Sequence, residues 1–95
     1  MVVGVSRLSL IIHTSFSLKD KRSVLRQLKD RTRRRFNVSI AEVGKNDVVN
    51  RAEIGITVVG NERRHVNSTL DTVNHFIEEL YLAEVVDCEL ELLNY

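Results

Sequence analysis

Three segments of the chain carry apolar residues at every second position, which is the period of a β-strand with one buried face. They cover residues 2–12, 51–59 and 84–93. A shorter stretch, residues 37–43, alternates in the same way. The pattern therefore predicts four strands, and in the last of them acidic residues occupy the alternate, solvent-facing positions.

Two other segments follow the 3.6-residue period of an amphipathic helix. The first covers residues 18–36, where Ser17 is a favourable N-cap and Asp20 gives a weaker form of the capping box. The second is expected to begin after a cap at Asn61 and to end near Leu80. The expected core-facing residues are Leu18, Leu25, Leu28, Thr32 and Phe36 on the first helix, and Val66, Leu70, Val73, Ile77 and Leu80 on the second.

The order of these elements predicts an α+β fold, the ferredoxin-like β-α-β-β-α-β sandwich. Right-handed crossovers would place both helices on one face of a four-stranded antiparallel sheet, in the order 4-1-3-2. The 95 residues contain no proline and no Gly/Ser-rich linker, so we expect a single domain over 1–95. The residues expected to be mostly buried are Leu8, Leu10, Leu25, Leu28, Val38, Ile54, Ile56, Val58, Val73, Ile77 and Leu90.

Positive charge is concentrated in the first expected helix. Between Lys19 and Arg35 there are nine Lys or Arg residues and two acids, whereas the rest of the chain has five bases and 11 acids. On a helix these bases form a stripe beside the core stripe, roughly 21 Å long at a rise of 1.5 Å per residue. The stripe consists of Lys19, Arg22, Arg26, Lys29 and Arg33, and is thickened at its end by Arg34 and Arg35.

The simplest interpretation of such a stripe is a solvated helix face. However, like charges four residues apart lower the stability of a helix by a few tenths of a kcal/mol per pair. Six of the nine bases are Arg, whose planar guanidinium suits phosphate and carboxylate groups. We therefore expect an anionic partner, structured RNA or a ribosomal subunit, contacted mainly through its backbone. The seven stripe residues are the expected nucleic-acid-binding residues.

The same stretches also resemble a known family. SLKDKRSVLRQLKDRTRRRFNVSIAEV, followed by RAEIGITVVGN and HVNSTLDTVNHFIEEL, is similar to the YlxP-like family of small bacterial proteins of unknown function. The resemblance implies a ferredoxin-like fold and a cytoplasmic setting. Because members are often encoded beside translation and ribosome-maturation factors, it also implies a link to RNA or to the ribosome. It supplies no catalytic residues.

Two other functions remain open. The sheet face away from the helices would carry Val3, Val5, Ile11 and Val59, and an apolar patch there would suit a protein-interaction or homodimer surface. The third choice is an ACT-like domain that binds a small regulatory ligand, although the first loop, residues 13–17, lacks the glycine usual there. An RNA-recognition motif is disfavoured, because the first and third strands have no aromatic residues to stack on bases.

Signals of catalysis are weak, and we expect a protein that is not an enzyme and that needs no cofactor or metal. The single cysteine, Cys88, is expected as a small core residue. His75 lies four residues after Asp71, a spacing more typical of a local surface pair than of a catalytic dyad. His65 lies in the first turns of the second helix, where we expect a plain surface role rather than a phosphate site, because no Gly-rich loop precedes it. His13 lies in the first loop. No apolar run reaches the ~20 residues of a membrane span, so we expect no membrane partner.

Overall fold

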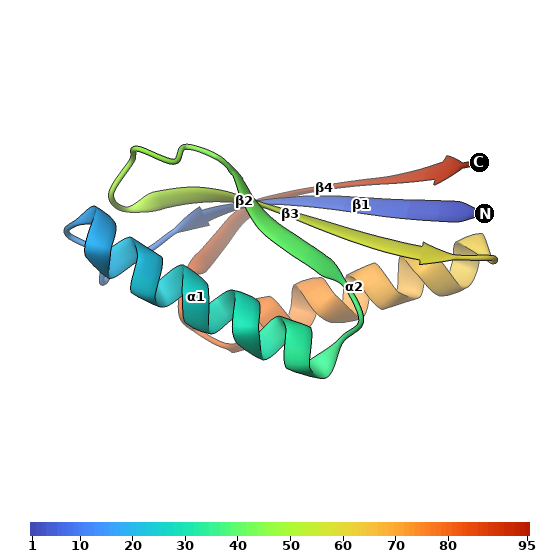
Figure 1. Ribbon diagram of the computed structural model, residues 1–95, viewed down its shortest axis with the longest axis horizontal. Helices are drawn as coiled ribbons and strands as arrows, with labels where there is room; N and C mark the ends of the chain where they lie inside the picture. Colours follow the sequence, from blue (N-terminus) through green and yellow to red (C-terminus); the bar gives the residue numbers. More distant parts are fainter.

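The computed structural model describes residues 1–95 and contains six elements in the predicted order (Figure 1). They are β1 (Val2–Ile11), α1 (Leu18–Arg35), β2 (Ser39–Gly44), β3 (Arg51–Gly60), α2 (Arg63–Glu79) and β4 (Glu84–Asn94). The four strands form one antiparallel sheet in the order β2-β3-β1-β4. The predicted ferredoxin-like α+β fold and its strand order are confirmed.

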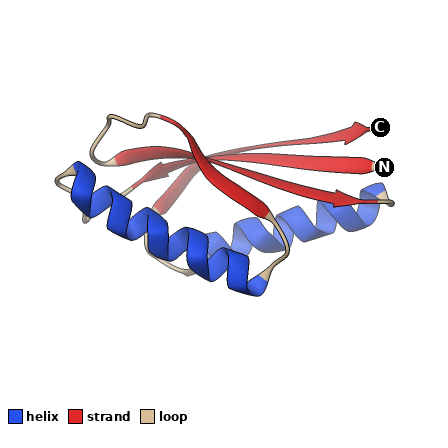
Figure 2. Cartoon of the chain, in the orientation of Figure 1, coloured by secondary structure: helices blue, strands red, loops and turns tan.

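Both helices cover the same face of the sheet, as predicted, and the other face is open (Figure 2). β1 is central, and it pairs with β3 on one side and with β4 on the other. Val3 of β1, for example, lies opposite Val59 of β3 and opposite Leu93 of β4. Neither helix has the length and apolar character needed to cross a bilayer.

One apolar core fills the space between the sheet and the helices. It contains 15 buried residues, drawn from both helices, from β1 to β3 and from Ile12 just beyond β1, but none from β4. Nine of the 11 residues predicted to be mostly buried belong to it. Val38 is only partly buried, because it precedes β2 and packs against the margin of the core.

Two residues of β4 are less buried than the sequence predicts. Leu90 keeps 37% of its surface exposed, and Cys88 is exposed as well. Both lie on the face that the helices cover, since Leu90 is opposite the buried Ser6 and Cys88 is opposite Leu8. Their prediction as core residues is wrong because β4 is an outer strand and the helices do not fully cover it.

The N-terminus of each helix can be compared with the predicted N-cap. Ser17 is the N-cap of α1, and its Oγ accepts a hydrogen bond of 3.0 Å from the backbone N–H of Asp20. The carboxylate of Asp20 in turn accepts from the N–H of Phe16 at 3.0 Å. The predicted cap of α2 at Asn61 is wrong: β3 extends to Gly60, the N-cap position falls on Glu62, and no side chain caps it.

Candidate nucleic-acid interface

The basic residues of α1 form a surface along the helix, where their spacing placed them. Six of the seven predicted nucleic-acid-binding residues are exposed, and Lys29 is partly buried. The exposed six are Lys19, Arg22, Arg26, Arg33, Arg34 and Arg35. The cations of this stripe are therefore accessible to a large partner.

Part of the stripe borders a groove between α1 and the edge strand β2. The groove has a volume of about 210 Å³. Its lining residues are Arg22, Leu25, Arg26, Lys29, Asp30, Arg33 and Glu42. Four cations thus surround one concave surface, and a concave basic surface focuses positive potential on an approaching anion.

The C-terminal end of α1 is held by some of the same cations. One η nitrogen of Arg33 donates a hydrogen bond of 2.9 Å to the carbonyl of Ile40 in β2, and the other lies 3.9 Å from the carboxylate of Asp30. The guanidinium of Arg35 lies 5.8 Å from the ring centre of Phe76 in α2, a cation–π distance. Arg33 and Arg35 therefore position the helix as well as adding to its charge.

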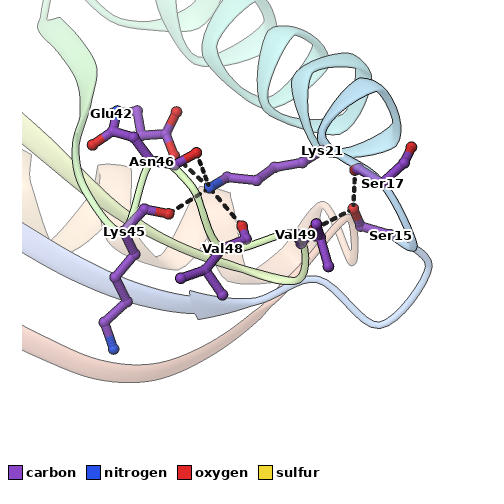
Figure 3. A network of polar contacts seen from close by, with 8 residues as sticks. All are labelled: Ser15, Ser17, Lys21, Glu42, Lys45, Asn46, Val48 and Val49. Carbon is purple, nitrogen blue, oxygen red and sulfur yellow. Dashed lines mark hydrogen bonds and ion pairs between the residues drawn. The ribbon is translucent and has the colours of Figure 1, made fainter.

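Lys21, which belongs to the basic segment but not to the stripe, is almost completely buried. Its ammonium forms an ion pair of 2.8 Å with Glu42 of β2 (Figure 3). The same group donates to the carbonyls of Lys45 at 2.8 Å and Val48 at 2.9 Å, with Asn46 at 3.4 Å. An ammonium has three donors and no acceptor, so Lys21 is satisfied by these partners and fastens the β2–β3 loop to the first turn of α1.

Ser15 strengthens the same junction. Its side chain is buried and donates to the carbonyl of Val49, and it lies 3.1 Å from the carbonyl of Ser17 (Figure 3). The start of α1 and the loop after β2 are therefore joined by two side chains. The α1–β2 groove is built on a fixed rather than a loose pair of elements.

The ion pair of Lys21 also changes the charge of the groove. Glu42 lies in the lining, and an unpaired carboxylate there would repel a phosphate. Its Oε2 atom is buried and makes no other polar contact than the ion pair with Lys21. The buried ammonium of Lys21 thus neutralises the carboxylate of Glu42 from the protein interior. The exposed cations of the groove therefore do not have to pair with Glu42, and their positive charge remains available to an anion from solvent.

The open sheet face carries the residues predicted for a protein interface. Val59 is 67% exposed, whereas Val3, Val5 and Ile11 are partly buried. Val59 and Val3 form an apolar row with Leu93 across three strands. Farther along the face Arg7 and Glu53 lie 4.0 Å apart, so the apolar patch is limited to one end.

A family model described as "Protein of unknown function (DUF503)" matches residues 3–90. The chain belongs to this family. A relative from Bacillus subtilis (strain 168), the uncharacterized protein YlxP, is 36% identical over 77 residues, which are 81% of this chain and 84% of the relative. The YlxP-like resemblance found in the sequence is therefore confirmed, and neither description assigns an activity.

This DUF503 chain has a larger hollow of about 530 Å³, formed by the loop after β1, the end of α2 and the start of β4. It is lined by His13, His75 and several acids, and Nε2 of His13 lies 2.7 Å from the carboxylate of Glu84. No cluster of three or more His, Cys, Asp or Glu could hold a metal ion. The acidic lining does not suit an anionic partner, so the larger hollow is not the candidate site.

Proposed function

We propose that this DUF503 protein binds structured RNA through the exposed basic surface of α1, without catalysing a reaction on it. The observation that carries the proposal is the α1–β2 groove, where Arg22, Arg26, Lys29 and Arg33 surround one concave surface. A ribosomal subunit is the proposed particle, which is what the YlxP-like resemblance implies. Arg suits this role because its fork can contact two phosphate oxygens at once.

The contacts are proposed to be with phosphates and shape rather than with base edges. The open sheet face has no aromatic side chain on β1 or β3, so bases have no stacking platform there. A row of cations along one face of a helix suits a backbone of regularly spaced phosphates. Such contacts position a protein on RNA but carry little sequence information.

The direct test reverses two charges of the stripe. Replacing Arg26 and Lys29 with Glu should weaken binding to ribosomal subunits and to a model hairpin RNA alike. The matched control is Arg63→Glu with Arg64→Glu, which makes the same change in net charge at two exposed positions of α2. Binding is measured by fluorescence anisotropy at low salt, and circular dichroism checks that each variant is folded.

The control separates the stripe from the net charge of the molecule. If both double variants lose affinity equally, only total charge matters and α1 is not the docking surface. If the wild type does not bind either RNA at low salt, the proposal is wrong and the stripe is a solvated face.

A second candidate function is a homodimer through the open sheet face. It is favoured by the row of Val3, Val59 and Leu93, in which Val59 leaves most of its side chain in solvent. Sedimentation at micromolar concentration should then show a dimer in the wild type and a monomer after Val59→Glu. A wild-type monomer would leave the row as ordinary surface.

A further inference from the structure

β4 is an edge strand whose outer side is free. With 11 residues it is the longest strand, and it pairs with β1 from Glu84 to Asn94. No strand pairs with its other side, and in Figure 2 that side forms the margin of the sheet. A long unpaired edge is a ready template for an additional strand.

The opposite edge of the sheet is protected. β2 has only six residues, and its register with β3 is interrupted between Glu42 and Gly44. Arg33 of α1 donates to the carbonyl of Ile40, so a backbone acceptor of β2 is already occupied. Short length, irregular register and a covering side chain are ways in which proteins block an edge. The register of β4 with β1 shifts only near the start of β4, between Val85 and Asp87, and is regular from Asp87 to Asn94.

The two faces of β4 differ in chemistry. Its exposed residues on the open face include Asp87, Glu89 and Glu91, which alternate with residues on the helix-covered face. On the helix-covered face Leu90 and Cys88 remain partly in solvent. A strand beside β4 would therefore meet carboxylates on one face and uncovered apolar surface on the other.

We propose that β4 binds an extended segment of a partner protein as a fifth strand, and that this segment alternates Lys or Arg with apolar residues. Opposite charges across neighbouring strands stabilise a sheet, and apolar pairs do the same on the other face. The basic positions of the segment would pair with Asp87, Glu89 and Glu91. Its apolar positions would cover Leu90 and Cys88.

A second copy of this chain does not fit the same edge. Pairing β4 with β4 of another copy, with all helices on one face, would set the acids of one strand against the acids of the other. Like charges directly opposite destabilise a strand pair. The other free edge of a second copy, β2, is obstructed by Arg33. The charge of β4 thus selects a basic partner and excludes self-pairing.

The test uses a capped eight-residue peptide that alternates Val and Lys, with fluorescence anisotropy as the readout. A control peptide of the same composition places the four Lys together, so its charge is equal but its alternation is lost. Two further peptides carry N-methyl groups on all Val amides or on all Lys amides. Alternate amides of a strand point to opposite edges. A peptide that lies beside β4 in one direction therefore turns either its Val amides or its Lys amides toward β4, and only one of these two peptides should lose its hydrogen bonds to β4.

The expected result is that the alternating peptide binds and shifts the backbone amide resonances of β4, whereas the clustered control binds at least about tenfold more weakly. One N-methylated peptide should also bind at least about tenfold more weakly, since several hydrogen bonds are blocked, and the other should bind normally.

Variants of the protein test the charge of β4. Glu89→Lys should weaken binding of the alternating peptide. Asp47→Lys makes the same charge change on the exposed β2–β3 loop and should not weaken it. Equal binding of all four peptides, equal loss for both N-methylated peptides, no effect of Glu89→Lys, or no binding at all would each overturn the proposal.

Discussion

At the scale of single residues, Lys21 is the least ordinary feature of the chain. It stands on the core side of α1 at the spacing of the apolar stripe, between Leu18 and Leu25. A buried ammonium is tolerated only with good partners, and Glu42 and the loop carbonyls supply them. Its role is to hold two elements together rather than to add to the basic surface.

Replacing Lys21 with Ala should lower the free energy of unfolding by about 3 kcal/mol, because the partly buried Glu42 and the loop carbonyls lose their partner. Urea denaturation followed by circular dichroism measures the change. The control is Lys19→Ala, which removes an exposed cation from the same helix turn and should change stability by less than about 0.5 kcal/mol. Equal effects of the two substitutions would show that the buried contacts of Lys21 contribute nothing.

The spacing of apolar residues in the sequence indicates that Lys21 is buried, but its charge suggests that it belongs to the basic surface. Its position completes the core spacing of three, four, three and four residues from Leu18 to Thr32, yet a lysine there is naturally assigned to the basic segment. Its partners, Glu42 and three carbonyls of residues 45–48, lie on another element. No local pattern predicts a contact with backbone atoms of a distant loop.

At the scale of elements, the regular parts of the fold followed from periodicity, whereas positions near ends and edges did not. Strong alternation in β1 and β3 predicted their buried residues, because the helices cover one face of these central strands and leave the other face open. Leu90 and Cys88 of β4 alternate as well, but their burial depends on how far the helices reach over the edge. Alternation gives the face of a residue and not its distance from the core.

The N-cap of α1 gives a prediction at this scale. Replacing Ser17 with Ala should lower the free energy of unfolding by about 1 kcal/mol, since the N–H of Asp20 loses its acceptor. Ser23→Ala is the matched control, because Ser23 is exposed within the same helix and Ala has the higher helix propensity. Thermal denaturation of both variants measures the two changes in stability. If Ser23→Ala lowered stability as much as Ser17→Ala, a specific role of the cap would be contradicted.

At the scale of the whole molecule, positive and negative charge lie at opposite edges of the sheet. The cations of α1 lie beside the edge strand β2. The acids of the second half of the chain include those of β4, the other edge strand. Residues 65–95 contain seven acids and no Lys or Arg. The protein therefore has a large dipole despite a net charge of +1, and a polyanion should meet it with α1 foremost.

This arrangement predicts a steep dependence of RNA binding on salt. If about five phosphates are neutralised, the logarithm of the affinity should fall with the logarithm of the salt concentration at a slope of roughly −3.5 to −4.5. The slope is obtained from anisotropy titrations between about 50 and 200 mM salt. The Arg26→Glu, Lys29→Glu variant should give a shallower slope, and an unchanged slope would argue that these residues touch no phosphate.

The central place of β1 has a consequence for how the chain folds during its synthesis. β1 is synthesised before the other strands, but its neighbours in the sheet are β3 and β4. Ile11 can pair with β3 only after Arg51, its partner residue, has been synthesised. At roughly 5–20 residues per second, those 40 residues take roughly 2–8 s to synthesise. Over that time the apolar β1 segment is unpaired. Because β1 pairs only with strands that lie far along the chain, it raises the contact order of the domain, and we expect it to fold more slowly than a helical bundle of similar size.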